Sequence, residues 1–203
     1  MNQAIDTLMK EHRAIERVLT ALETAARRTR EGAPLERSRV AQFADFFSHF
    51  ADTCHHGKEE DLLFKQMVSV GFSSDQGPIA VMLSDHRIGR EHVAALRGIG
   101  AASGAMTAAE RTAFIKNAEA YVPMLRQHIL KEDRVLYPMA VQAIPPADME
   151  RLAAAFEEFE RHVMGPGVHE GFHRLADSLT EAYREQPDDQ SGAEGGGRSH
   201  GRS

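Results

Sequence analysis

Histidine offers this sequence its clearest chemistry, with eleven histidines in 203 residues. Imidazole titrates near neutral pH and is the commonest metal ligand in proteins. Residues four or seven apart share one face of an α-helix. On that spacing His12, His86 and His128 each fall on the apolar face of a predicted helix. Buried imidazoles need compensation for lost hydration, and a bound metal provides it.

The segment Cys54–Glu60 offers two histidine–glutamate pairs four residues apart, His55 with Glu59 and His56 with Glu60. The apolar side chains around this segment centre on the side of His56 and Glu60. They leave His55 and Glu59 about a quarter turn away. We therefore expect His56 and Glu60 to face inward, with Glu59 behind the ligands or on the surface.

A second carboxylate accompanies His128 in the same way. Glu132 follows it by four residues and shares its face, whereas Asp133 lies about 140° round the helix and should point elsewhere. Two further side chains are expected near a bound group. Arg90 leans inward one turn after the third-helix histidine, and Tyr121 shares the face of His128 and would line an access path. Arg90 at the surface, with only its stem buried, is an equally open alternative.

The predicted ligand set is His12, His56, Glu60, His86, His128 and Glu132, with Arg90, Tyr121 and Glu59 close by. Six ligands are too many for one tetrahedral zinc ion. They suit two metal ions, each held by two histidines and bridged by the two glutamates. Nitrogen and carboxylate donors without thiolate favour non-haem iron, oxo- or hydroxo-bridged, with manganese or zinc possible. An open position would take dioxygen, peroxide or nitric oxide. A metal-free structural bundle is the alternative.

Four stretches with apolar residues at helical spacing must position these side chains. They cover residues 2–30, 36–70, 79–97 and 107–142, and glycines between 98 and 104 should end the third. We expect Pro123 to kink the fourth and Pro138 to weaken or break it near its end. Long amphipathic helices with short connections pack antiparallel. The prediction is an all-α, up-down four-helix bundle over 1–142, a short C-terminal helical extension over 143–185 and a disordered tail over 186–203.

Composition excludes several other classes of protein. The formal net charge is −6, which argues against nucleic acid as the main partner. No run of about 18 apolar residues is present, so no membrane span is expected. A single cysteine cannot form an internal disulfide, and the N-terminus lacks the pattern of a signal peptide, so we expect a cytoplasmic protein.

Four segments carry a family resemblance. EHRAIE, HHGKEEDLLF, SDHRIGREH and HILKEDRVLYP occur in this order over residues 1 to about 142 and resemble the hemerythrin-like family of HHE cation-binding domains. The resemblance implies an up-down four-helix bundle that holds a non-haem di-iron centre. The positions that match the family's ligands are His12, His56, Glu60, His86 and His128, and Glu132 matches the second bridging carboxylate of many bacterial members.

Two departures from oxygen-carrying hemerythrins bear on the activity. Arg90 stands where those proteins have a fifth histidine, and Glu132 replaces an aspartate one residue further along. The resulting set of four histidines and two glutamates is similar to bacterial members linked to iron–sulfur repair and to nitric-oxide or peroxide stress. The resemblance implies a protein that binds dioxygen, nitric oxide or peroxide in stress response or iron handling. A di-iron redox enzyme that consumes peroxide is the alternative.

A separate motif lies in the predicted extension. His169, Glu170 and His173 match HExxH, the signature of zinc hydrolases, with Glu170 as the general base. Gly171 weakens the helix, and no good third ligand follows. A surface or packing helix is the favoured interpretation of this segment.

Overall fold

The computed structural model describes residues 3–165 and 167–184, and the predicted tail over 186–203 lies outside them. Every regular element within these residues is helical, and none is a strand. The prediction of an all-α fold is confirmed.

The first two rods of the bundle follow the predicted stretches closely. Helix α1 (Gln3–Arg30) is followed by a turn at Gly32, whose positive φ of 96° is a left-handed conformation that favours glycine. The second rod runs without interruption through α2 (Arg37–Asp45), η1 (Phe46–His56), η2 (Glu59–Leu63) and α3 (Phe64–Ser69). The segments η1 and η2 are π-helical. Their amides donate to carbonyls five residues back, as Gly57 does to Asp52.

Helix α4 (Gly77–Ala101) is longer than the sequence predicts, because it continues through Gly98 and Gly100. A Cβ atom at Gly100 would lie only 2.7 Å from the backbone nitrogen of Ala41 in α2. This glycine therefore allows two helices to approach closely and does not end one, and the break expected between 98 and 104 begins only after Ala101.

The fourth rod combines α5 (Ala108–Lys131), η3 (Glu132–Leu136) and α6 (Tyr137–Ala143). Thr107 and Glu110 cap its start with a reciprocal pair of side-chain to backbone hydrogen bonds. The helix continues through Pro123, and Pro138 does not break it either. Pro138 is the second residue of α6, in the turn where the π-helical hydrogen bonds of η3 change to the α-helical pattern, and a missing donor there does not end the rod.

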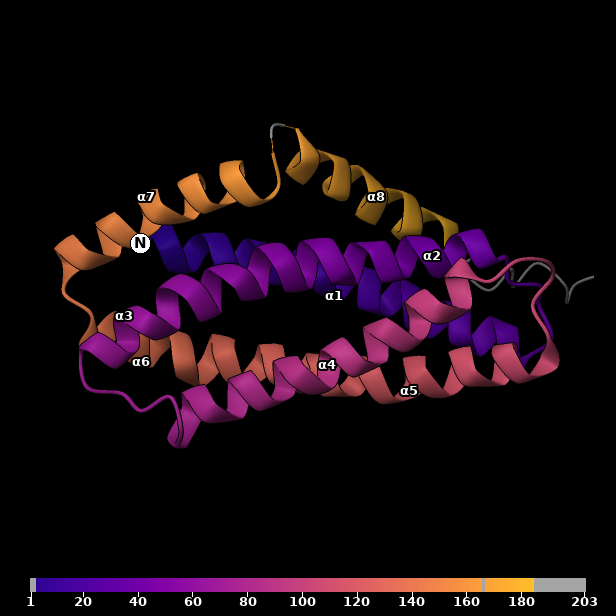
Figure 1. Ribbon diagram of the computed structural model, residues 1–203, viewed down its shortest axis with the longest axis horizontal. Coiled ribbons are helices and arrows are strands. Elements are labelled where there is room, and N and C mark those ends of the chain that lie inside the picture. Colours follow the sequence, from indigo (N-terminus) through magenta and orange to yellow (C-terminus); the bar gives the residue numbers. More distant parts are fainter. Residues whose placement is uncertain (1–2, 166, 185–203) are drawn as a thin grey trace, which may run out of the picture.

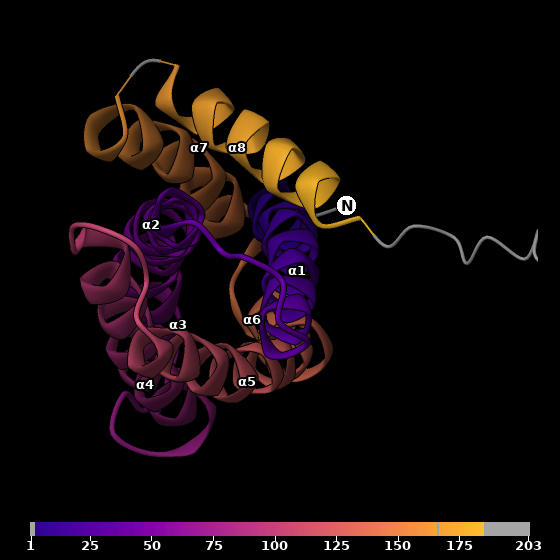
Figure 2. The same ribbon diagram turned by 90° about the vertical axis from the view of Figure 1, so that its right-hand side faces the viewer.

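The four rods pack side by side as the predicted up-down bundle, as Figures 1 and 2 show. Two further helices, α7 (Pro146–Val163) and α8 (Val168–Ala182), lie across one side of it. Both contact α1 and η1, and α7 also contacts η2. The extension therefore covers the part of the second rod that contains His55, His56 and Glu59.

The core consists of two apolar clusters, one towards each end of the bundle. One contains Phe43, Phe47, Leu19 and Phe114, and the other contains Leu8, Leu63, Met67 and Leu136. The buried histidines lie between these clusters along every rod, so the apolar ends fix the helices around a polar layer. None of the helices in the described residues is long and apolar enough to cross a membrane.

Candidate metal centre

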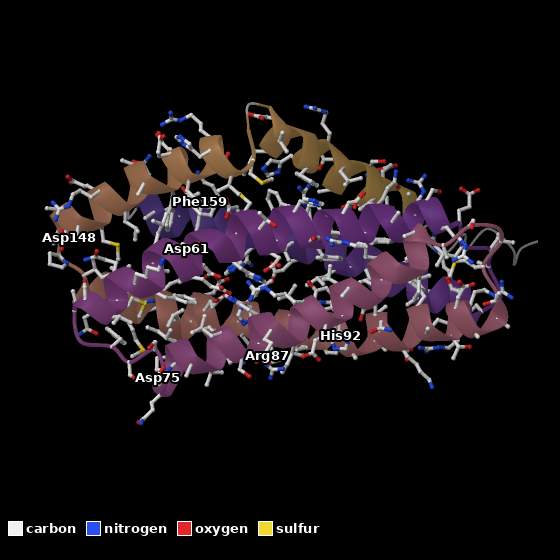
Figure 3. All side chains as sticks on the ribbon, viewed as in Figure 1. Asp61, Asp75, Arg87, His92, Asp148 and Phe159 are labelled. Atoms are coloured by element: carbon white, nitrogen blue, oxygen red, sulfur yellow. The ribbon has the colours of Figure 1, made fainter. Side chains whose placement is uncertain are left out.

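Seven buried ionisable side chains from all four rods converge in the polar layer. They are His12 from α1, His55, His56 and Glu59 from the second rod, His86 from α4, and His128 and Glu132 from the fourth rod. None is more than 4% exposed. Figure 3 shows side-chain nitrogen and oxygen atoms gathered between the helices in the middle of the bundle. Ionisable groups buried at this density need partners that a hydrocarbon core cannot supply.

The seven side chains form two groups that share one carboxylate. One group is His12, His55, Glu59 and Glu132, and the other is His56, Glu59, His86 and His128. Each residue offers a ligand atom, and within each group these atoms lie within 4.8 Å of one another. Each group alone has the donors to hold a cation.

Glu132 also spans the two groups. Its Oε2 lies 3.2 Å from Nε2 of His12 and 3.1 Å from Nε2 of His128. Oε2 of Glu59 lies 3.5 Å from Nε2 of His86. Both carboxylates therefore lie between imidazoles of different helices, where a bridging ligand would lie.

Each of the five rings directs its Nδ1 atom to a carboxylate outside the two groups. The Nδ1–oxygen pairs are His12–Asp133 at 2.7 Å, His55–Glu11 at 2.9 Å, His56–Asp52 at 3.3 Å, His86–Glu60 at 2.7 Å and His128–Asp85 at 3.4 Å. A carboxylate that accepts from Nδ1 fixes the tautomer and leaves the Nε2 lone pair for a metal. This arrangement orients all five imidazoles for coordination.

Cationic side chains stand behind these outer carboxylates. The pairs are Arg13 with Asp133, Lys58 with Glu11, Arg90 with Asp52 and Glu60, and Lys131 with Asp85. At Asp52, burial raises the pKa, but hydrogen bonds from His56 and Arg90 outweigh it and hold that pKa at about 2. Arg90 thus helps to keep Asp52 ionised and in place.

Four atoms in the two groups have no hydrogen-bond partner among the described residues. They are Nε2 of His55, Oε2 of Glu59 and both carboxylate oxygens of Glu132. A buried polar atom without a partner costs about 1–3 kcal/mol. A cation satisfies imidazole nitrogen and carboxylate oxygen at once, so the residues present fit bound metal ions.

The pKa values of the imidazole rings depend on their burial and on the charged groups beside them. Burial lowers the pKa of His56 to about 3, and the charge of His86 adds to this effect. At His128, burial lowers the pKa, but Glu132 and Asp85 outweigh it and raise the pKa to about 10. The Nε2 atoms of His86 and His128 face each other at 3.1 Å. Metal binding would displace protons from such rings, because only the neutral imidazole coordinates.

Tyr137 is the one phenol that reaches the centre. Its hydroxyl donates to Oε1 of Glu59 at 2.7 Å and lies 3.3 Å from Nε2 of His12. Burial raises the pKa of this phenol well above its usual value, with the charges of Glu59 and Glu132 adding to it. The hydroxyl therefore stays protonated and orients the carboxylate that both groups share.

Comparison with known families identifies the arrangement. The family model described as "Hemerythrin HHE cation binding domain" matches residues 3–140, which include every residue of the two groups. This chain belongs to the hemerythrin HHE cation-binding family. The expected resemblance is confirmed, and the family accounts for a buried cation site in the polar layer.

The relatives found by sequence comparison are uncharacterized proteins, so they do not indicate which function this hemerythrin-like chain has. It is 22% identical to the uncharacterized protein Rv1995 of Mycobacterium tuberculosis and to the uncharacterized protein Mb2018 of Mycobacterium bovis. Each match extends over 178 residues, 88% of this chain and 68% of the relative. No solved structure matches the chain.

The structure brings together five of the six predicted ligands of the hemerythrin-like site, namely His12, His56, His86, His128 and Glu132. It does not place Glu60 with them. Glu60 is partly exposed, and its Oε1 accepts from Nδ1 of His86 at 2.7 Å and from Arg90 at 2.8 Å. The central carboxylate of the second rod is Glu59, which we expected behind the ligands or on the surface.

The π-helical turns explain this difference. The sequence prediction assumes α-helical spacing, which sets His55 and Glu59 a quarter turn off the core face. In η1 and η2 each residue advances by a smaller angle, so His55 and His56 both turn inward and Glu59 takes the position expected for Glu60. The adjacent pairs His55-His56 and Glu59-Glu60, four residues apart, are the only sign in the sequence that both histidines and Glu59 face the core.

Two other expected neighbours lie further out. Arg90 holds Asp52 and Glu60, and none of its hydrogen bonds or ion pairs within the described residues reaches either donor group. Tyr121 packs edge-on against Phe47 and near the ring of His92, as a core residue. Asp133, expected to point elsewhere, contacts His12 from outside, because π-helical η3 begins one residue earlier.

The HExxH segment forms no complete metal site in the described part of the chain. Nε2 of His169 and Nε2 of His173 lie 2.8 Å apart. However, none of the groups of possible ligands among the described residues contains both histidines. The arrangement does not favour a zinc hydrolase at this position.

Proposed function

We propose that this hemerythrin-like chain holds two non-haem iron ions in its two donor groups. His12, His55 and Glu132 would hold one ion, His56, His86 and His128 the other, and Glu59 would contact both. The single observation that carries the proposal is the pair of four-residue groups that share Glu59. Imidazole and carboxylate donors without thiolate favour iron, with manganese or zinc as alternatives.

The two groups differ in the types of their donors and not in their number. The group with His56, His86 and His128 offers three imidazoles, whereas the group with His12 and His55 offers two. Each group offers four donors in all, because Glu132 completes the group with two imidazoles, so each ion would have room for an external ligand. When bound, an iron pair supplies reversible electron transfer and an open position for a small ligand.

The surroundings limit what that ligand can be. All seven donors are at most 4% exposed, so only a small molecule would reach them. Two carboxylates only partly neutralise two divalent ions, which favours anionic or electron-accepting ligands. We therefore propose dioxygen, nitric oxide or peroxide as the ligand, in a role in oxidative or nitrosative stress or in iron handling.

A peroxide-consuming enzyme is a second candidate, favoured by the hydroxyl of Tyr137 at the shared carboxylate. A buried phenol can hold or pass a proton beside Glu59. In such a reaction two molecules of peroxide yield two of water and one of dioxygen. Dioxygen released over many cycles per iron pair would indicate the enzyme, whereas one ligand bound per pair would indicate a binding protein.

The test is anaerobic loading with Fe(II), followed by desalting and measurement of iron per chain. We expect two irons, and a visible spectrum that changes when dioxygen, nitric oxide or peroxide is added. No retained iron would contradict the proposal. Retention of two irons with no spectral response to any of the three would contradict the ligand assignment.

A further inference from the structure

A second polar cluster lies under the C-terminal extension, outside the two donor groups. It consists of Glu11 from α1, Cys54 from η1, Glu160 from α7 and His169 from α8, and one ligand atom from each lies within 4.8 Å of the others. Cysteine, histidine and carboxylates are the ligands of zinc. The cluster therefore has the composition of a third metal site.

The cation in this cluster is the ammonium group of Lys58. This side chain is fully buried, its Nζ contacts the carboxylate of Glu11, and it lies 3.5 Å from Oε2 of Glu160. A charged ammonium within reach of both carboxylates takes the place that a metal would need.

This cluster is joined directly to the metal centre. Oε1 of Glu11 contacts Lys58, and Oε2 of the same carboxylate accepts from Nδ1 of His55 at 2.9 Å. A chain of contacts thus leads from Glu160 through Lys58 and Glu11 to His55. Its inner members are shielded from water, so charge interactions along it are screened little.

The extension is held firmly at this point. Gly57 precedes Lys58, and a Cβ atom there would lie 2.7 Å from the ring of Phe159 in α7. Figure 3 labels Phe159 on α7, above the second rod. On α8, Nδ1 of His169 lies 3.0 Å from Oε1 of Glu160. The close contact at Gly57 and the ion pair between α7 and α8 fix where Glu160 meets Lys58.

We propose that the C-terminal extension tunes the metal ion held by His55, with Glu160 and Lys58 as positioning residues. This inference rests on the proposed two-metal function. Glu160 holds the ammonium of Lys58, the ammonium holds Glu11, and Glu11 orients the ring of His55. The rings of the three-histidine group have other outer carboxylates, so this series of contacts acts on one ion and not on the other.

The test measures the two Fe(II) binding constants of the full chain by anaerobic competition with a chelator. Glu11→Gln should weaken one constant by about 10- to 100-fold, the usual effect of losing an outer partner of a ligating histidine. Glu160→Gln should weaken the same constant by up to about tenfold and leave the other unchanged. Glu158→Gln, the same change at an exposed position of α7, is the matched control and should change neither.

Combined variants separate positioning from general loss of stability. The Glu11→Gln substitution already breaks the series of contacts between Glu160 and His55. Adding Glu160→Gln to this variant should therefore weaken iron binding no further. Asp85→Asn, at the outer partner of His128, should instead add its effect to that of Glu160→Gln. A Glu160→Gln effect that persists in full in the Glu11→Gln background would overturn the inference.

The remaining outcomes are equally decisive. Two irons in the wild type with both constants unchanged in Glu160→Gln would contradict the inference alone. Fewer than two irons in the wild type would contradict the proposed function, and the inference with it. A third tightly bound metal ion per wild-type chain would show that the cluster takes a metal and not the ammonium.

Discussion

Glu59 links the two donor groups, and replacing it with glutamine separates its effects on folding and on metal binding. Its Oε1 accepts from Tyr137, and its Oε2 has no hydrogen bond among the described residues. That oxygen faces Nε2 of His55 at 3.7 Å and Nε2 of His86 at 3.5 Å. Glutamine at position 59 keeps an oxygen for Tyr137 and turns an amide donor towards two imidazole lone pairs.

The two effects should have opposite signs. In the metal-free protein, relieving the unpartnered oxygen should raise the free energy of unfolding by about 1–3 kcal/mol. For a chain of this size each kcal/mol shifts the melting temperature by about 2–4 °C. In the presence of Fe(II), the wild type gains stability through binding. The Glu59→Gln variant should lose most of that gain, because it removes a ligand from both ions.

Thermal unfolding with a chelator and with Fe(II) measures both effects on the same samples. Glu60→Gln is the matched control, one residue away and partly exposed. It should keep both ions, with one bound about 10- to 100-fold more weakly, because Glu60 only orients His86. If Glu60→Gln lost both ions while Glu59→Gln kept them, the π-helical phase of the second rod would be refuted.

Three further predictions concern single positions. His55→Ala should lower the metal content as strongly as His56→Ala, and a wild-type metal content in His55→Ala would remove this histidine from the site. Burial raises the pKa of Cys54 to about 12, so about one thiol in ten thousand is ionised at pH 8. An alkylating reagent should therefore not label the native protein. Complete labelling within minutes would contradict the burial of this thiol. A hydrogen bond from Arg37 and others at the start of α5 lower the pKa of Glu110 to about 2. Because this pKa is lowered, the ionised Glu110 stabilises the fold above pH 4.5, and this stabilisation is lost as the pH falls to about 2. Over that range the melting temperature of metal-free Glu110→Gln should fall less than that of the metal-free wild type. The same dependence of melting temperature on pH in both proteins would argue against the ion pair.

The α-helical parts of this molecule could be predicted from apolar spacing. The apolar stripes of α1, α4 and α5 are regular, and the structure places His12, His86 and His128 on the core face as expected. Glycine misled the prediction at Gly100, because the sequence does not reveal whether a glycine ends a helix or lets another helix approach. That distinction depends on Ala41, more than fifty residues away.

The second rod could not be predicted in the same way. Its π-helical turns are not encoded by a local pattern of residue types, and they shift the phase of every side chain that follows. The same effect in η3 brings Asp133 to His12. Apart from Asp52, which lies four residues before His56 in η1, each outer carboxylate comes from a different rod than its histidine or from a distant position, so these pairings appear only once the bundle is packed.

The account depends on two metal positions that share Glu59. The most direct measurement is the anomalous scattering of iron in crystals of the Fe(II)-loaded chain, which locates each ion and its ligands. We expect two iron positions, one beside His12 and His55 and the other beside His56, His86 and His128, with Glu59 contacting both. A single iron position, or a pair that contacts Glu60 in place of Glu59, would contradict the account.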